Sequence, residues 1–154
     1  MHFNINTFES NSLRLICNRR DEITINNKTI RFLNRINGVA VSQTSIYILL
    51  YECDESGDIH GAVQPLNNID AYDYEGNLQW NISEIIGDVP NPFIFIEVHT
   101  KKTISERLEN KGWGFDSEHV IDGHEFLFCS DIGGLYYVID ITEKKLIYRK
   151  GFRS

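Results

Sequence analysis

Residues 116–126, with the sequence DSEHVIDGHEF, contain the side chains of this protein that are best suited to chemistry. Two histidines, His119 and His124, lie within this stretch. Histidine nitrogens and carboxylate oxygens bind transition metals, and both groups transfer protons near neutral pH. Four carboxylates accompany the histidines: Asp116, Glu118, Asp122 and Glu125. The stretch is therefore a candidate metal or acid–base site.

The same stretch also has the pattern of a β-hairpin. The Asp-Gly dipeptide at 122–123 favours a type I′ turn, in which both central residues need a positive φ. This turn would join a strand at 118–121 to a strand at 124–130. In that register His119 lies opposite Phe126, and the two histidines are diagonal neighbours roughly 7–8 Å apart.

The face that would carry the histidines looks like a packing surface. It also carries Ile121, Phe126 and Phe128, which are apolar. A zinc site needs further converging ligands, and nothing in the sequence places the remaining candidate, His99, beside the other two. We therefore predict a hairpin here, with no metal ion and no catalytic residue.

The cysteines and the known catalytic motifs support a non-enzymatic protein without a cofactor. Cys17, Cys53 and Cys129 are widely separated and form no CxxC pair, as expected for buried, reduced thiols. The chain also lacks a GxSxG motif, a P-loop and an HExxH motif. The alternative is a hydrolase that uses His119, His124 and neighbouring acids.

Charge is distributed unevenly along the chain. The formal net charge is −7, but residues 51–99 contain ten acidic residues and residues 36–100 contain no lysine or arginine. Such a segment forms either a solvated surface or a face that meets a basic partner. Nucleic acid is a poor candidate partner, because its phosphates would be repelled.

The acidic segment supplies the predicted partner-binding residues. The loop CDESGDIHG, residues 53–61, crowds three carboxylates into a turn that we expect to be exposed. The strand and turn at 70–75 add further carboxylates and two tyrosines. The predicted set consists of Asp54, Glu55, Asp58, Asp70, Tyr72, Asp73, Tyr74 and Glu75.

Alternation of apolar and polar residues with period two runs through most of the chain. Twenty-one isoleucines, which are β-branched, fit such strands. The sequence predicts an all-β fold of antiparallel meanders with one short helix near residues 103–111. We expect Thr103 to be its N-cap, Glu106 the capping-box partner and Gly112 the C-cap, with Ile104 and Leu108 facing the sheet.

Two segments of the chain repeat one pattern. NIDAYDYEGNLQW (68–80) and LYYVIDITEKKLIY (135–148) each run from an apolar strand to an aspartate, cross a polar turn and return to an aromatic residue. A hydrophobic strand precedes each segment. Repeated meanders are typical of propeller blades. Because two units cannot close a ring, we expect an open, twisted assembly of blade-like units.

The segments 68–83 and 131–152 resemble a group of small bacterial β-proteins. Their shared pattern is an Asn-Ile strand, a glycine turn and LQWNI, followed later by GGLYYVID and a lysine-rich return strand. Many members of that group are immunity proteins, which neutralise toxins exchanged between competing bacteria. This chain departs from the pattern at Glu143, where a glycine is usual, and in the helical segment 100–113.

The resemblance implies a protein that binds and inhibits a cognate toxin domain, most simply a basic nuclease, by covering its active site. The alternative is a blade-like scaffold module with another partner. We expect one cytoplasmic domain, residues 1–154, that is a monomer or weak dimer and has no membrane contact. The N-terminus lacks the pattern of a secretory leader, and the longest apolar run, IYILLY, is too short for a membrane span.

Overall fold

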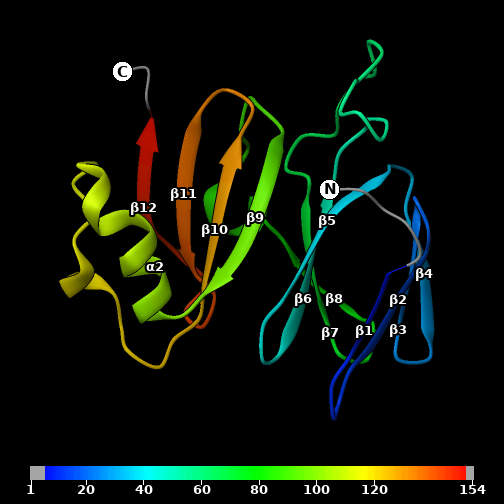
Figure 1. Ribbon diagram of the computed structural model, residues 1–154, viewed down its shortest axis with the longest axis horizontal. Coiled ribbons are helices and arrows are strands. Elements are labelled where there is room, and N and C mark those ends of the chain that lie inside the picture. The colour runs from blue at the N-terminus through cyan, green and yellow to red at the C-terminus, as the bar shows by residue number, and fades with distance from the viewer. Residues whose placement is uncertain (1–5, 152–154) are drawn as a thin grey trace.

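The computed structural model describes residues 6–151. These residues form twelve β-strands in three four-stranded antiparallel sheets, and each sheet is a meander of consecutive strands. The all-β prediction is confirmed. Figure 1 shows the three sheets side by side, with β1–β4 at one end of the row and β9–β12 at the other. The chain therefore contains three blade-like units, one more than the repeated pattern revealed.

The strands are short, as the frequent turn residues predict. The first sheet contains β1 (Asn6–Glu9), β2 (Arg14–Arg19), β3 (Glu22–Ile25) and β4 (Lys28–Arg31). The second contains β5 (Ile36–Val41), β6 (Ser45–Leu50), β7 (Ile69–Asp73) and β8 (Leu78–Asn81). The third contains β9 (Phe93–His99), β10 (Phe126–Asp131), β11 (Leu135–Asp140) and β12 (Lys145–Gly151). The two repeated segments are β7–β8 and β11–β12, the third and fourth strands of their sheets.

The strand axes of all three sheets have roughly the same orientation across the row, so their connections lie above and below the sheets, at the two ends of the strands. We call the end at the top of Figure 1, with the connections β2–β3, β4–β5, β6–β7, β8–β9 and β10–β11, the upper end. The other connections lie at the lower end, but the long β9–β10 connection, which contains α2, also covers the outer face of the third sheet. Hydrogen bonds tie neighbouring sheets together at each end. Asn68 bonds the backbone of Phe93 at the upper end, and the Gln43 amide donates to Glu125 at the lower end.

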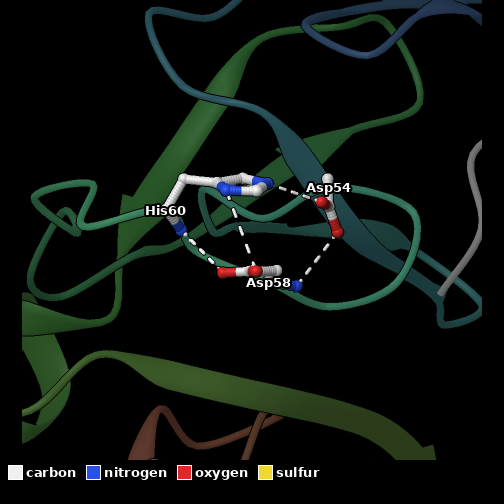
Figure 2. Close-up of side chains that lie close together, drawn as sticks. All are labelled: Asp54, Asp58 and His60. Atoms are coloured by element: carbon white, nitrogen blue, oxygen red, sulfur yellow. Dashed lines mark hydrogen bonds and ion pairs between the residues drawn. The ribbon is translucent and has the colours of Figure 1, made fainter.

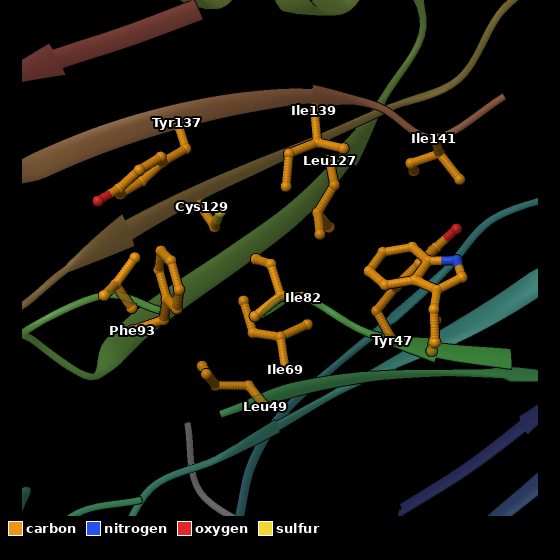
Figure 3. Close-up of a cluster of buried hydrophobic side chains, with 13 residues drawn as sticks. Tyr47, Leu49, Ile69, Ile82, Phe93, Leu127, Cys129, Tyr137, Ile139 and Ile141 are labelled. Carbon is orange, nitrogen blue, oxygen red and sulfur yellow. The ribbon is translucent and has the colours of Figure 1, made fainter. Parts of the chain in front are cut away.

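Two apolar clusters of residues 6–151 hold neighbouring sheets together, and a third joins α2 to the third sheet. The largest lies between the second and third sheets and includes Tyr47, Leu49, Phe93 and Leu127 (Figure 3). A second cluster, rich in isoleucine, joins the first and second sheets. The β-branched side chains thus fill the spaces between sheets, because every second side chain of a strand points to the same face of its sheet.

The predicted helix exists but begins earlier than expected. The helix α2 spans Lys101–Leu108, and Thr100 is its N-cap, with a capping box to Thr103. The prediction of Thr103 as N-cap and of Glu106 as its capping-box partner is therefore wrong. The threonine hydroxyl at position 103 can close the box, as Glu or Gln usually does. Ile104 and Leu108 are fully buried against the third sheet, as predicted.

Short helical turns complete the secondary structure. A 3-10 turn, η1 (Glu109–Lys111), ends at Gly112, whose φ of 70° gives the expected left-handed C-cap. A four-residue helix, α1 (Ser83–Ile86), and a 3-10 turn, η2 (Ser117–His119), were not predicted. Among residues 6–151 no helix has the length and apolar character needed to cross a membrane.

The predicted hairpin at 118–130 is not formed. Phe126 pairs with His99 on one side and with Asp140 on the other, so both edges of β10 are occupied. Residues 120–125 form an irregular connection with a turn, in which Gly123 has a φ of 86°. The longer apolar strand β9 competes successfully for the edge of β10 that the hairpin would have used.

The two outer faces of the row are covered differently. On the third sheet, α2 and the segment after it pack against Phe126, Phe128 and Val138. On the first sheet most outward side chains other than Ile16 are polar, and several are bonded to one another: Asn18 donates to Glu22 and to Thr24. Neither outer face therefore presents an extended bare apolar surface.

Candidate partner-binding surface

The acidic loop, residues 52–62, projects from the upper end between β6 and β7 (Figure 1). One carboxylate organises it. Asp54 Oδ1 accepts hydrogen bonds from the backbone amides of Ser56 at 2.9 Å and Asp58 at 3.0 Å, and from the Ser56 hydroxyl at 2.7 Å. Short side-chain-to-backbone bonds of this kind replace regular secondary structure in turns. The loop therefore has a defined shape.

A histidine completes the loop (Figure 2). The Nε2 atom of His60 lies 2.6 Å from Asp54 Oδ2, and its backbone amide donates to Asp58 Oδ1 at 2.9 Å. Hydrogen bonds from the Ser56 hydroxyl and His60 hold the pKa of Asp54 well below its usual range. Ligand atoms of Asp54, Asp58 and His60 lie within 4.8 Å of one another, a spacing that a metal ion could bridge. Hydrogen bonds within the loop already engage both Asp54 oxygens.

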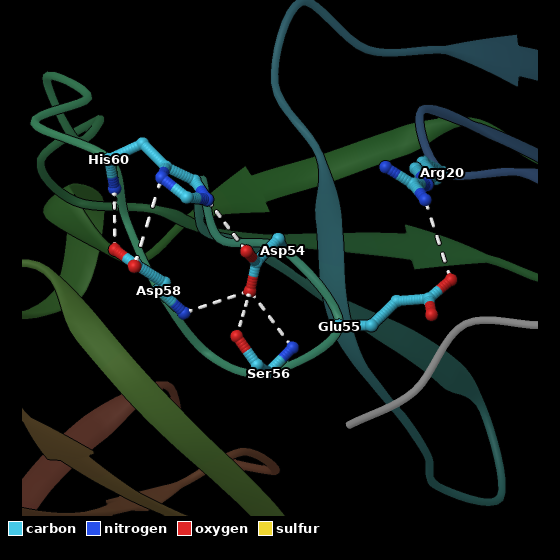
Figure 4. A network of polar contacts seen from close by, with 6 residues as sticks. All are labelled: Arg20, Asp54, Glu55, Ser56, Asp58 and His60. Atoms are coloured by element: carbon cyan, nitrogen blue, oxygen red, sulfur yellow. Dashed lines mark hydrogen bonds and ion pairs between the residues drawn. The ribbon is translucent and has the colours of Figure 1, made fainter.

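Glu55 and Asp58 are the carboxylates of this loop that remain most accessible. Glu55 lies 3.4 Å from Arg20, but both side chains are about three-fifths exposed (Figure 4). Such an ion pair contributes only about 0–1 kcal/mol and is screened by salt. Asp58 is also 59% exposed. Glu55 can therefore meet a partner without breaking a strong contact, and Asp58 can do so through Oδ2, because its Oδ1 accepts the His60 amide.

The other predicted residues lie on β7 and on the turn after it, away from the acidic loop. The Asp73–Glu75 turn is at the lower end, and five-residue β7 separates it from the loop by about 15 Å. Asp73 Oδ1 accepts the amides of Glu75 and Asn77, both at 2.9 Å. Only Glu75 of this group is exposed. The structure thus separates the eight predicted residues: three lie in the acidic loop at the upper end, Asp70 and Tyr72 lie on β7, and three lie at the lower end.

The remaining members of the predicted set have structural contacts. Tyr72 is 8% exposed and packs in the cluster between the first two sheets. The Tyr74 hydroxyl donates to the Ser42 carbonyl at 2.6 Å. Asp70 accepts a bond from Asn81 at 2.8 Å, and burial raises the pKa of this carboxyl. Each of these side chains therefore has a structural role within the protein that does not require a binding partner.

The two histidines of the opening stretch are not brought together. His119 is 82% exposed and lies 3.3 Å from Asp116. His124 Nδ1 lies 2.8 Å from Asp140 Oδ2, and Asp140 is only 2% exposed. The other Asp140 oxygen accepts the amide of Glu143 at 3.0 Å, so this aspartate caps the β11–β12 turn. Asp73 caps the β7–β8 turn in the corresponding way.

The His124–Asp140 pair ties the connection before β10 to the β11–β12 turn. We expect His124→Ala to lower the free energy of unfolding by about 1–3 kcal/mol, because it leaves a buried carboxylate oxygen without its partner. His119→Ala, at an exposed position, is the matched control and should change stability by no more than about 0.5 kcal/mol. Chemical denaturation of both variants measures the difference. Equal stabilities would show that the pair has no structural role.

A polar cleft of about 560 Å³ opens at the lower end between the second and third sheets. The side chains of Ser45, Trp80, His124 and Glu125 are among those that line it. Behind it, the Tyr47 hydroxyl is fully buried, and burial raises the pKa of Tyr47 to about 12. No pattern in the sequence indicated this cleft, because its walls come from β8 and from the β5–β6, β9–β10 and β11–β12 connections.

Exposed apolar side chains favour the upper end, a feature that sequence reasoning missed. Ten large hydrophobic residues of the described chain are exposed, and three of them, Phe8, Leu78 and Ile121, lie elsewhere. The seven at the upper end are Leu33, Ile59, Val63, Leu66, Ile94, Phe95 and Ile132. Contiguous apolar surface rimmed by polar groups marks interaction sites. The upper end therefore combines the acidic loop with apolar residues.

Two of the three cysteines are buried as expected, whereas Cys53 is not. Cys17 and Cys129 are buried, and desolvation raises the pKa of Cys17 to about 11 and that of Cys129 even further. Cys53 is partly exposed, and its thiol donates to Asn37 Oδ1 at 3.4 Å. All three are free thiols. A thiol with a raised pKa is a poor nucleophile at neutral pH.

The arrangement of three meander sheets in a row defines a propeller-like all-β protein. No known protein family matches the chain, and no curated protein matches it. Among solved structures, it is similar to BBS1N in the crystal structure of BBS1N in complex with ARL6DN, with a TM-score of 0.58. The likeness covers 97% of this chain but only 36% of that one, at 10% sequence identity. At this identity it shows a shared fold alone.

Proposed function

We propose that this protein is a binding module that docks a basic protein partner on its upper end, and that the partner is a toxin domain. The observation that carries the proposal is the prefolded acidic loop. Asp54 shapes the loop internally and Glu55 extends its charge into solvent, whereas Asp58 accepts the His60 amide with Oδ1 and is still 59% exposed. The loop also lies at the same end as seven exposed apolar residues. Charge and apolar surface together are what a protein partner requires.

The inhibitory mechanism follows from this charge. A nuclease toxin binds phosphates through a basic groove, and carboxylates arranged on a firm loop can occupy the same groove. Residues 36–100 contain no lysine or arginine, so their own segment supplies no neutralising charge. Complementary fields steer the two proteins together and fix their orientation. The toxin is then blocked by occupation of its substrate site rather than by any chemical reaction.

A scaffold function in another complex is the second candidate. The observation in its favour is the likeness to BBS1N, which was solved in complex with another protein, ARL6DN. Both functions use a blade-like module as a protein-binding surface. The identity of the partner separates them. The decisive partner to test is the C-terminal domain encoded by the reading frame immediately upstream of the gene.

The charge-reversal variant Glu55→Lys/Asp58→Lys tests the docking surface. Asp54 is left in place because it shapes the loop. We expect the association rate constant with the upstream-encoded domain to fall about tenfold at low salt, since surface charges act mainly on the rate of encounter. High salt should slow the wild type toward the variant, because screening weakens the attraction. Biolayer interferometry at two salt concentrations gives both rate constants.

The control reverses two exposed acids away from the upper end, Glu118→Lys/Glu143→Lys, and should associate like the wild type. Growth of cells that express the upstream-encoded domain, with and without each variant, supplies the functional readout. If that domain is toxic and the wild-type protein neither binds it nor restores growth, toxin inhibition is excluded for this pair. If both double variants behave alike, the acidic loop is not the docking surface.

A further inference from the structure

The edges of two neighbouring sheets meet beside the acidic loop. The strands β5 and β9 are edge strands of the second and third sheets, and they lie against each other. Within residues 6–151, no backbone hydrogen bond joins these two strands. A cavity of about 170 Å³ lies between them, lined by Asn37, Gly38, Leu49, Ile94, Phe95 and Ile96. Its walls are mainly apolar, and it lies toward the upper end.

Gly38 creates the space for this cavity. A Cβ atom at this position would lie 3.3 Å from both Cβ and Cδ2 of Leu49, and 3.6 Å from Cγ1 of Ile96. The backbone of Gly38 does not have the positive φ that would itself demand glycine. Glycine is therefore needed at this position because a side chain would crowd Leu49, and not because of its backbone conformation. A larger residue would fill the cavity that Leu49 and Ile96 border.

The rim of the cavity is exposed and apolar on one side. Ile94 is 40% exposed and Phe95 is 37% exposed, although β9 is an edge strand, where exposed apolar residues invite association. The Phe95 ring packs edge-to-face on Phe128, with 6.2 Å between ring centroids. The Phe95 ring lies on the α2 side of the third sheet with Phe128, whereas Ile96 faces the second sheet, so this contact anchors the β9 strand beside the cavity. An anchored strand lowers the entropy cost of receiving a partner side chain.

The other side of the rim is joined to the acidic loop. Asn37, a lining residue, accepts a hydrogen bond from Cys53 at 3.4 Å, and Asp54 is the next residue along the chain. The cavity and the carboxylates of the loop therefore belong to one surface. A side chain that enters the cavity brings its own neighbours close to this negative charge.

We propose that the β5–β9 cavity receives one apolar side chain of the partner, flanked in that partner by lysine or arginine. The inference rests on the proposed function, because it names the anchor of the same docking surface. A buried anchor residue in a preformed pocket dominates affinity and slows dissociation. The acidic loop, in contrast, accelerates association. The cavity is thus expected to set the dissociation rate constant, and the acidic loop the association rate constant.

A first experiment tests the cavity without any toxin. Small ammonium compounds serve as probes in NMR titrations of the 15N-labelled protein: 3-methylbutylammonium and phenethylammonium carry an apolar group, and methylammonium carries the charge alone. The two apolar probes should shift the amide signals of Gly38, Leu49 and Ile96, and methylammonium should not. Absence of these shifts at millimolar probe concentrations, or equal shifts with methylammonium, would overturn the inference.

A second experiment uses the purified upstream-encoded domain. Ile94→Ser removes one wall, and Gly38→Ala narrows the cavity. We expect each variant to raise the dissociation rate constant, Ile94→Ser by about tenfold or more, with little change in association. Leu78→Ser, at an exposed apolar position of the lower end, is the matched control and should dissociate like the wild type. Thermal unfolding confirms that each variant is folded.

The two experiments separate failure of the anchor from failure of the toxin proposal. If the probes bind in the cavity but the upstream-encoded domain does not bind the protein, the cavity is a real anchor site for a different basic partner. If the domain binds tightly and Ile94→Ser and Gly38→Ala dissociate like the wild type, the anchor proposal is wrong while the docking proposal remains.

Discussion

Replacing Asn68 with leucine is expected to destabilise the protein by about 3–5 kcal/mol, because buried polar groups left without partners each cost about 1–3 kcal/mol. Asn68 is 3% exposed and lies just before β7. Its amide nitrogen donates to the carbonyls of Leu50 at 2.7 Å and Phe93 at 2.8 Å, and its Oδ1 accepts the Phe93 amide at 2.8 Å. Leucine has a similar volume but can make none of these bonds.

Urea unfolding followed by tryptophan fluorescence measures the effect. The matched control is Gln79→Leu on exposed β8, whose amide takes part in a single long hydrogen bond with Ser45 at 3.4 Å. It should change the free energy of unfolding by no more than about 0.5 kcal/mol. An Asn68→Leu protein as stable as the wild type would mean that the second and third sheets do not depend on this cross-link.

Truncating Phe128 to alanine is expected to cost about 3–5 kcal/mol, the usual range for a large aromatic residue in a core. Phe128 is fully buried. Tyr136 stacks on its ring with 5.6 Å between centroids, and the Arg107 guanidinium of α2 lies 5.2 Å from the ring centroid. The substitution therefore leaves a cavity where the third sheet meets its helix.

Phe8→Ala, at a position that is 46% exposed, is the control and should have a much smaller effect. Phe128→Leu should lie between the two alanine variants. Circular dichroism during thermal unfolding measures the order. If Phe128→Ala unfolds at the same temperature as Phe8→Ala, the contact between α2 and the third sheet contributes little to stability.

Local patterns predicted the strands and several turns well. Period-two alternation located strands in all three sheets, although it missed β1 (Asn6–Glu9) and placed a strand at 118–121 that is not formed. Gly76 and Gly134 have the positive φ that turns require. The Asn-Ile pair of the repeated segment also has a physical explanation, since Asn68 cross-links two sheets. These features depend on neighbouring residues or on a single side chain, so a sequence can reveal them.

Competition between distant strands was not predictable from local patterns. The Asp-Gly dipeptide at 122–123 favoured a hairpin, but β9, which lies over twenty residues earlier, pairs with β10 instead. The first sheet was not recognised as a third unit because its sequence lacks the aspartate-turn pattern of β7–β8 and β11–β12. Nothing local distinguishes a strand's eventual neighbour when both candidates are apolar.

The candidate surface was only partly accessible to sequence reasoning. The acidic loop stood out through its composition, and the structure leaves Glu55 and Asp58 about three-fifths exposed. The role of Asp54 as an internal acceptor depends on the loop conformation, which composition does not encode. The upper-end location of Ile94 and Phe95 depends on strand direction and sheet order, and these become visible only in the assembled fold.

The different coverings of the two outer faces set a limit on self-assembly. A row of sheets can grow into fibres when a terminal face matches the opposite face of another copy. Here α2 shields one terminal face, and the bonded polar side chains around Asn18 and Thr24 make the other unsuitable for dry packing. Packing of a further sheet on either terminal face is therefore unfavourable. This leaves the protein free to concentrate exposed apolar residues at its upper end without inviting its own copies to polymerise through the sheets.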